Sequence, residues 1–159
     1  MKYYIIIRGP LGCGKSTVAK EIARKMKGKY VSIDAIIDKN KLYHDKEQGY
    51  ISQASFIKAN SIAIKYLKKA EFAVFDGNFY WKSQIENLVN SLNCEHKIFT
   101  LKASIKKCIE RDSKRIKSYG KDATKLVYKK STEFDYGEII DTERQTEKET
   151  INEILEKIS

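Results

Sequence analysis

A glycine-rich segment near the N-terminus constrains the fold more than any other part of the chain. Gly9, Gly14, Lys15 and Ser16 have the spacing G-x-x-x-x-G-K-[ST], which is typical of a phosphate-binding loop. Glycines allow positive φ angles and a close approach of the backbone to an anion, and a following helix N-terminus adds partial positive charge. The motif therefore predicts a nucleotide phosphate site at Gly9, Gly12, Cys13, Gly14, Lys15, Ser16 and Thr17.

The flanking residues favour this interpretation over a chance glycine-rich turn. The run from Tyr3 to Ile7 is apolar, aromatic and β-branched, as in a buried parallel strand. From Lys15 onward, apolar residues recur at the spacing of a helix packed on a sheet: Val18, Ala19, Ile22, Ala23 and Met26. In such a motif the lysine reaches the β- and γ-phosphates of the nucleotide, and the hydroxyl of Ser16 holds Mg²⁺.

The rest of the chain alternates between strand and helix patterns. Strands are expected at 30–33, 72–75, 96–101 and 139–141, and the segment 39–49 is interpreted as a surface loop. Helices are expected at about 52–70, at 80–93 with Trp81 in a packing role, after a Ser104 cap, at 123–131, and after a capping box, Thr146 to Glu149. We therefore expect a single domain over residues 1–159, an α/β three-layer P-loop NTPase fold with a five-stranded parallel sheet and helices on both faces.

Carboxylates follow two of the expected strands. Asp34 comes at the end of the second strand, where ligands bind in open α/β sheets, and Asp38 lies one helical turn later and is left as an alternative. Asp76 ends an apolar strand in the manner of a Walker B carboxylate, which binds the Mg²⁺ shell. The next residues, Asn78, Phe79 and Tyr80, are expected near the acceptor side.

Two arginines mark a candidate lid. Arg111 and Arg115 are four residues apart on an expected helix, so both guanidinium groups are predicted to share one face and to contact phosphate oxygens. A break at Tyr119-Gly120 separates this helix from the next. Helix, break and helix with a basic surface describe a hinged cover over a phosphate site, here at about 111–130.

Charge is distributed unevenly along the chain. Lysine and arginine outnumber aspartate and glutamate 31 to 21, and residues 102–130 hold eleven basic side chains against three acidic ones. Such a block is able to contact ATP, a phosphorylated acceptor or a nucleic-acid backbone, or simply to solvate the surface. Cys13, Cys94 and Cys108 are scattered and odd in number, and no apolar run is long enough to span a membrane, so a reduced, cytoplasmic protein is expected.

In order and spacing, these residues resemble the P-loop kinases of the nucleoside-monophosphate kinase-like group. The chain is most similar to the small branch that contains polynucleotide 5′-hydroxyl kinases, zeta toxins and chloramphenicol phosphotransferase. That similarity extends to the run from Arg111 to Arg115 and to residues 123–128. The chain departs from the group in lacking an arginine set for a nucleoside-monophosphate phosphate between the second and third strands.

The resemblance implies transfer of the γ-phosphoryl of ATP to a hydroxyl. Lys15 would hold the phosphates, Ser16 with Asp76 would hold Mg²⁺, and Asp34 matches the general base of this branch. Arg111 and Arg115 would stabilise charge on the transferring phosphoryl. The acceptor is left open between a nucleic-acid 5′-hydroxyl and a small metabolite. The alternatives are a nucleotide-binding ATPase or switch without an acceptor, and a nucleic-acid-binding module with a vestigial nucleotide site.

Overall fold

The computed structural model describes residues 1–67 and 69–159. Five parallel strands form one sheet in the order β2-β5-β1-β6-β7. Their bounds are β1 (Tyr3–Arg8), β2 (Lys29–Ser32), β5 (Phe72–Asp76), β6 (Glu95–Lys102) and β7 (Glu138–Asp141). The central strand β1 is almost entirely apolar because helices cover both of its faces. The expected five-stranded parallel sheet is confirmed.

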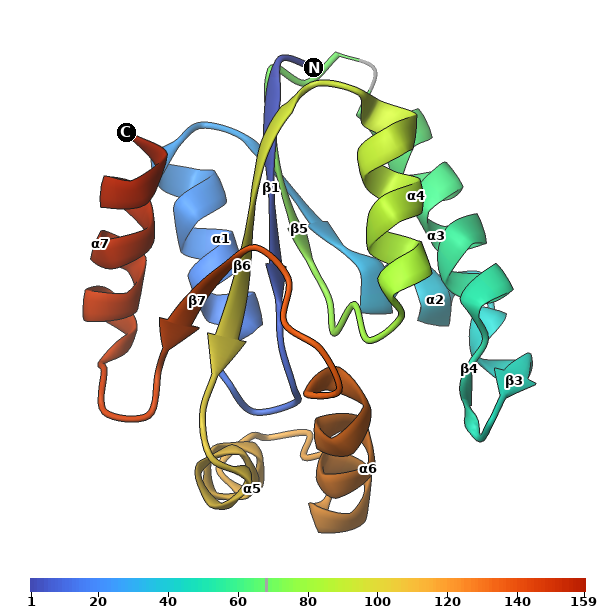
Figure 1. The fold of residues 1–159 in the computed structure, drawn as a ribbon, viewed down its shortest axis with the longest axis vertical. Coiled ribbons are helices and arrows are strands. Elements are labelled where there is room, and N and C mark those ends of the chain that lie inside the picture. Colours follow the sequence, from blue (N-terminus) through green and yellow to red (C-terminus); the bar gives the residue numbers. More distant parts are fainter. Residues whose placement is uncertain (68) are drawn as a thin grey trace.

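Helices cover both faces of this sheet (Figure 1). One face packs against α1 (Lys15–Lys25) and α7 (Glu147–Ile158), and the other against α3 (Gln53–Tyr66) and α4 (Lys82–Leu92). Successive residues of β1 point to opposite faces, so Ile5 and Ile7 belong to one core and Tyr4 and Ile6 to the other. Ile6 of one core and Ile7 of the other are near the carboxyl end of β1, which leads into the glycine-rich segment.

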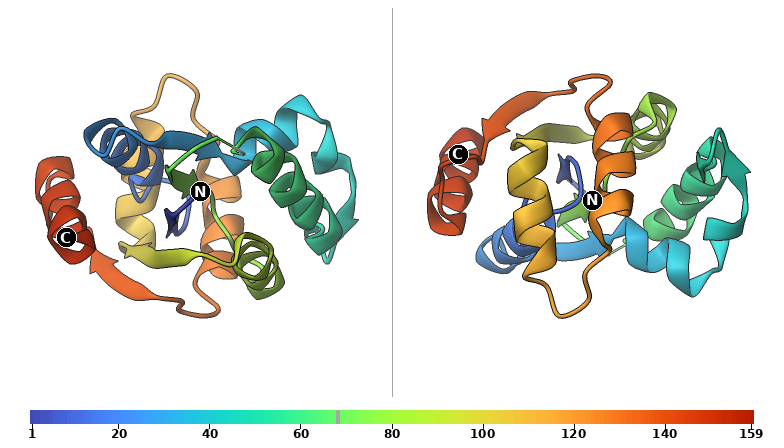
Figure 2. Two further views of the ribbon diagram at one scale, coloured as in Figure 1. Left: turned by 90° about the horizontal axis from the view of Figure 1, so that it is seen from above. Right: turned by 90° about the horizontal axis from the view of Figure 1, so that it is seen from below.

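Two further helices lie beyond the carboxyl ends of the strands. In Figure 1, α5 (Ile105–Ser113) and α6 (Lys121–Ser131) lie at the bottom of the molecule, and Figure 2 shows them side by side from below. Residues 114–120 connect them, as the predicted break requires. Because ligands bind at the carboxyl edge of open α/β sheets, this helix pair is positioned to cover a site.

The segment between β2 and α3 is more ordered than the predicted surface loop. It contains α2 (Ile33–Lys39), a 3₁₀ helix (Leu42–His44) and a short antiparallel hairpin of β3 (Lys46–Glu47) and β4 (Tyr50–Ile51). The indole Nε1 of Trp81 donates to the carbonyl of Ile51 at 2.7 Å, and Trp81 is buried. This confirms the packing role of Trp81 and ties the hairpin to the start of α4.

Several predicted boundaries were wrong. The second strand ends at Ser32, whose Oγ accepts from the backbone N–H of Ala35 and caps α2, so Asp34 lies in a helix rather than at a strand end. Met26 follows the end of α1 and is exposed. The helix predicted over 52–70 ends at Tyr66, which is exposed, and Lys68 lies outside the described residues. Beyond the end of α3, Leu67 and Ala70 still pack on the core, but as part of a turn and not of the predicted helix.

Cys13, Cys94 and Cys108 are all free thiols, and the first and third are buried. Among residues 1–67 and 69–159, no helix is both long and apolar enough to cross a membrane.

Candidate active site

The glycine-rich segment is held in its turn by close backbone contacts. Gly9, Gly12 and Gly14 have φ angles of 146°, 80° and 93°, a region that side chains disfavour. A Cβ atom on Gly12 would lie 2.2 Å from the carbonyl oxygen of Cys108, and one on Gly9 would lie 2.6 Å from that of Leu101. The loop therefore packs directly on β6 and α5, which only glycine permits.

The same turn leaves a run of backbone donors for a ligand. The helix α1 begins after Gly14 with no side-chain cap and no acidic residue in its first turn. Among the backbone-to-backbone hydrogen bonds of turns, loops and caps in the described part of the chain, none has a donor between Leu11 and Thr17. Unpartnered N–H groups at a helix N-terminus favour an anion. The phosphate site at this turn stays a prediction, and the backbone geometry is compatible with it.

Lys15 extends back over this turn. Its Nζ donates to the carbonyl of Pro10 at 2.6 Å, and the side chain is buried. Burial raises the pKa of Asp34, and the positive charge of Lys15 partly opposes this by lowering it. The ammonium group of Lys15 is thus held by the loop backbone and is within electrostatic range of a carboxylate.

Ser16 and Asp76 belong to one polar cluster organised by Tyr30. The register of the sheet places Asp76 beside Ile7 on β1 and Ser32 on β2. The Tyr30 hydroxyl donates to Oδ2 of Asp76 at 2.7 Å, and Ser16 is close enough to affect the pKa of that phenol. Burial, with the Asp76 charge, raises the pKa of Tyr30 well above its ordinary value, so it stays a donor.

The cluster fits a nucleotide-bound Mg²⁺. The second oxygen of the Asp76 carboxylate, Oδ1, is buried and has no partner among the described residues. The described chain contains no group of three or more histidine, cysteine or acidic side chains arranged to hold a metal. Mg²⁺ with a nucleotide needs no such cage, because one or two protein oxygens, water and the phosphates suffice. The Asp76 oxygen and the Ser16 hydroxyl provide that minimal set.

Asp34 lies in the first turn of α2 and is partly buried. Burial raises its pKa to about 6, and the charges of Asp76 and Asp38 act in the same direction, whereas Lys15 and Arg115 oppose them. Asp38, the alternative candidate, is exposed. A carboxyl group whose pKa lies near neutrality is suited to proton transfer, and Asp34 meets that condition.

A cavity of about 180 Å³ opens beside Asp34. Leu11 of the phosphate loop forms part of its wall, and α2, β4, α3, the segment after β5 and the lid contribute the rest. The residues that line it are Leu11, Asp34, Ile37, Asp38, Ile51, Phe56, Asn78, Tyr80, Tyr119, Ala123 and Val127. Asn78 and Tyr80, expected near an acceptor, both reach this space.

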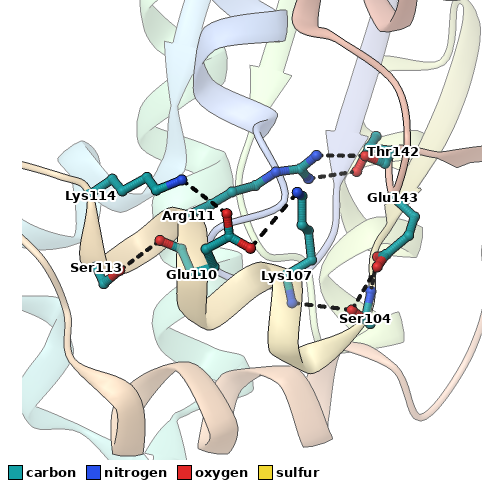
Figure 3. A network of polar contacts seen from close by, with 8 residues as sticks. All are labelled: Ser104, Lys107, Glu110, Arg111, Ser113, Lys114, Thr142 and Glu143. Carbon is teal, nitrogen blue, oxygen red and sulfur yellow. Dashed lines mark hydrogen bonds and ion pairs between the residues drawn. The ribbon is translucent and has the colours of Figure 1, made fainter.

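A second cavity, of about 280 Å³, lies on the other side of the loop and contains both lid arginines. The guanidinium of Arg111 donates to the Thr142 carbonyl at 2.6 Å and to its Oγ1 at 3.1 Å (Figure 3). Gly12, Cys13 and Gly14 line the same cavity. Arg111 therefore joins α5 to the segment after β7 beside the phosphate loop. A partly overlapping cavity of about 820 Å³ continues from Ser16 and Thr17 along α1 and α7.

Arg115 reaches this cavity in a different way from the predicted one. The helix α5 ends at Ser113, so the two arginines do not share a helix face. The carboxylate of Asp112 accepts from the Ser118 hydroxyl and from the backbone N–H groups of Tyr119 and Gly120. This buried carboxylate organises the connecting turn that carries Arg115, whose guanidinium lies 3.9 Å from it.

Sequence reasoning missed Arg8, which is fully buried at the end of β1. Its guanidinium donates to the backbone carbonyls of Phe79, Ser131 and Phe134 and to the Thr100 hydroxyl. Arg8 therefore links the strand that leads into the glycine-rich loop to the end of α6. A single charge directly before Gly9 in an apolar strand was the available signal. Thr142 and Tyr30 were also missed, and nothing in their sequence context marked them.

The overall architecture is similar to that of several solved kinases. A gluconokinase from Sinorhizobium meliloti 1021 aligns with a TM-score of 0.75 and 17% identity, over 96% of this chain and 89% of that chain. A shikimate kinase from Bacteroides thetaiotaomicron aligns with a TM-score of 0.67 and 15% identity, and a deoxyadenosine kinase from M. mycoides with 0.63 and 21%. The last two alignments cover 98% of both chains. Identities this low establish a shared fold, that of P-loop kinases.

No curated protein matches the sequence. The family model described as AAA domain matches residues 5–133, which include the glycine-rich loop, the sheet up to β6 and the helices α5 and α6. The chain therefore belongs to this AAA domain family of P-loop proteins.

Proposed function

We propose that the protein is a kinase that transfers the γ-phosphoryl group of Mg-ATP to a hydroxyl group of an acceptor. The observation that carries this proposal is the position of Asp34. This carboxylate is within the electrostatic influence of Lys15 and Asp76 on the phosphate side and lines a cavity on the other side. A base between a phosphate site and a second pocket is the arrangement that phosphoryl transfer to an acceptor requires.

In the reaction, the acceptor oxygen forms a bond to the γ-phosphorus while the bond from that phosphorus to the oxygen bridging to ADP breaks. Asp34 accepts the hydroxyl proton and returns it to solvent. The products are a phosphate monoester and ADP. With a pKa of about 6, Asp34 is mostly ionised at neutral pH and is a better base than an ordinary carboxylate.

The remaining residues act on the phosphates. The free N–H groups of residues 11–17 and the ammonium of Lys15 bind the β- and γ-phosphates. Ser16 and Asp76 hold Mg²⁺, which neutralises phosphate charge when it is bound. Arg111 and Arg115, which line the cavity beside the loop, stabilise charge that spreads over the transferring group. We take the whole chain as one kinase domain with a basic lid at about 111–130.

The alternative function, an ATPase or switch with no acceptor, makes no use of the cavity beside Asp34. A residue with a raised pKa that lines a pocket is more readily explained by an acceptor. The acceptor itself is not identified by the fold. The similarity of residues 111–115 to polynucleotide 5′-hydroxyl kinases keeps a nucleic-acid end among the compounds to be tested.

The test is transfer of labelled γ-phosphate from Mg-ATP to a panel of oligonucleotides with 5′-hydroxyl ends, nucleosides and small alcohols. We expect label on an acceptor, and a loss of at least about 100-fold in Asp34→Asn, because general base catalysis contributes that much. Asp122→Asn, which removes an exposed carboxylate at the start of α6, serves as the matched control. Phosphate release at the same rate with and without every acceptor would instead support the ATPase function.

A further inference from the structure

The cavity beside Asp34 has an unusual charge pattern for a kinase with ten excess positive charges. The ionisable acids that line it are Asp34 and Asp38, and its described lining includes no lysine, arginine or histidine. The strongly basic segment 102–130 contributes only Tyr119, Ala123 and Val127. Lys15 and Arg115 act on Asp34 from outside this lining, whereas the lining itself contributes two carboxylates, which oppose an anionic acceptor.

The size and walls of this cavity limit the acceptor further. Its volume of about 180 Å³ only slightly exceeds the roughly 150 Å³ of a cavity that accommodates benzene. Apart from its polar groups, the wall consists of aliphatic and aromatic side chains, with Phe56 and Tyr80 in edge-to-face contact. The space therefore fits a body of about one ring with apolar faces.

Asn78 supplies an unused polar group in this wall. The residue is 7% exposed, and its side-chain oxygen has no hydrogen-bond partner among the described residues. Buried amide groups are almost always hydrogen-bonded, so an unpartnered one that lines a cavity points to a ligand. The cost of leaving it unpaired is recovered when an acceptor hydroxyl or amine donates to it.

The backbone around Asn78 is held in a strained conformation. The next residue, Phe79, has a φ of 46°, which is rare for a bulky side chain. Arg8 donates from Nε to the Phe79 carbonyl at 3.3 Å, and the Phe79 side chain is fully buried. Strain of this kind persists where the surrounding structure imposes it, often at ligand sites. It fixes Asn78 and Tyr80 on the cavity wall.

We propose that this cavity selects a small neutral or cationic alcohol with a body of about one ring, and that Asn78 orients it. The inference rests on the proposed kinase function and narrows its acceptor. Under this inference, a polynucleotide 5′ end and a carboxylated sugar are disfavoured acceptors. The acceptor hydroxyl faces Asp34, Asn78 accepts a hydrogen bond from the acceptor, and Asp38 at the exposed edge favours a positive substituent.

Three benzylic alcohols that differ only in the para substituent provide a matched probe set: methyl, aminomethyl and carboxylate. Binding to the full chain is measured by calorimetry, with and without a non-hydrolysable ATP analogue, and transfer is measured separately from Mg-ATP. We expect the methyl and aminomethyl compounds to bind at least about tenfold more tightly than the carboxylate, because like charges oppose the last. An oligonucleotide with a 5′-hydroxyl end is expected not to compete.

Variants assign the effect to the cavity. Asn78→Ala is expected to weaken binding of the methyl compound by about fivefold or more, the effect of one lost hydrogen bond. Asn90→Ala, the same change at an exposed position of α4, is expected to leave it unchanged. Asp38→Asn changes an exposed side chain and is expected to leave folding unchanged. It is expected to reduce only the advantage of the aminomethyl compound, by about threefold to fivefold.

The two proposals fail in different ways. Binding in the expected order without label transfer would refute the kinase function and leave the cavity assignment standing. Label on the carboxylate compound or on the oligonucleotide at equal or higher efficiency would uphold the kinase and overturn the inference. Failure of all three probes to bind would also overturn it.

Discussion

Replacing Gly12 by alanine separates the two reasons for which the phosphate loop needs glycine. Gly12 has a φ of 80°, and an added Cβ would lie 2.2 Å from the Cys108 carbonyl oxygen and 2.9 Å from its carbon. Gly49, in the exposed hairpin turn, has a φ of 83° and no atom within 4 Å of such a Cβ. Gly12→Ala and Gly49→Ala thus share the conformational cost and differ in the clash.

The magnitudes follow from these geometries. A left-handed alanine costs about 1–2 kcal/mol, and the lower entropy of its unfolded chain offsets about 0.4–1 kcal/mol, so Gly49→Ala should lose about 1 kcal/mol. Gly12→Ala should lose a further 1–3 kcal/mol or so, because the clash is with the backbone of α5, which has to shift. For a chain of this length, the melting temperature should fall by about 3 °C and by about 6–12 °C respectively.

Urea unfolding and calorimetry of both variants test this reasoning. Nucleotide affinity, measured by titration with Mg-ATP, should fall in Gly12→Ala and stay unchanged in Gly49→Ala. Equal losses of unfolding free energy in the two variants would refute the idea that the loop is packed against the lid helix.

Three further outcomes are expected. Asp34 has a folded pKa raised from 3.8 to about 6, so its ionisation destabilises the fold above that range, and kcat/KM should fall as pH drops through about 6. Asp34→Asn should therefore raise the free energy of unfolding at pH 8 by about 1–2 kcal/mol, less than the roughly 3 kcal/mol for full burial, with little change at pH 4. A lower stability of Asp34→Asn at pH 8 would contradict this sign. Burial of Asp112 raises its pKa, but the hydrogen bonds from Ser118, Tyr119 and Gly120 outweigh it and hold the pKa below its usual value. In Asp112→Asn, hydrogen exchange should show that the free energy of opening of the turn 114–120 falls by about 1–3 kcal/mol. The KM for the acceptor should rise more than kcat falls, because Tyr119 of this turn lines the cavity. An unchanged KM would count against a role for Tyr119 there. Lysine cannot reproduce the four hydrogen bonds of Arg8, so Arg8→Lys should lower the free energy of unfolding in urea by about 3 kcal/mol. Arg24→Lys, at an exposed ion pair, should change it by no more than about 0.5 kcal/mol. Similar losses in the two variants would show that Arg8 does not link β1 to α6.

Patterns within the chain were sufficient for the elements that bury a regular apolar stripe. The run from Tyr3 to Ile7 and the spacing after Lys15 predicted β1 and α1, and the capping residues Ser104 and Thr146 marked the starts of α5 and α7. Local side-chain to backbone bonds create these signals, so they are readable from neighbours in the sequence.

Predicted helix and strand boundaries were wrong where a polar side chain bonds to the backbone within an otherwise regular apolar pattern. Ser32 caps α2 and so moved Asp34 from a strand end into a helix. The helix α5 ends at Ser113, and the Asp112 carboxylate bonds the following turn, so Arg115 lies in a turn and not on a helix face. Both effects depend on which backbone N–H groups lie near a side chain, which spacing alone does not reveal.

The sequence by itself determined the phosphate-binding loop, the alternation of strands and helices, and the order of the candidate site residues, because each depends on local spacing. Only the tertiary structure decided how distant residues meet. The pairing of Tyr30 with Asp76, the bond of Arg111 to Thr142, the span of Arg8 to α6 and the unpartnered Asn78 beside Asp34 join segments far apart in the chain. Such contacts arise from strand order and helix packing, and they carry the inferences about acceptor and lid.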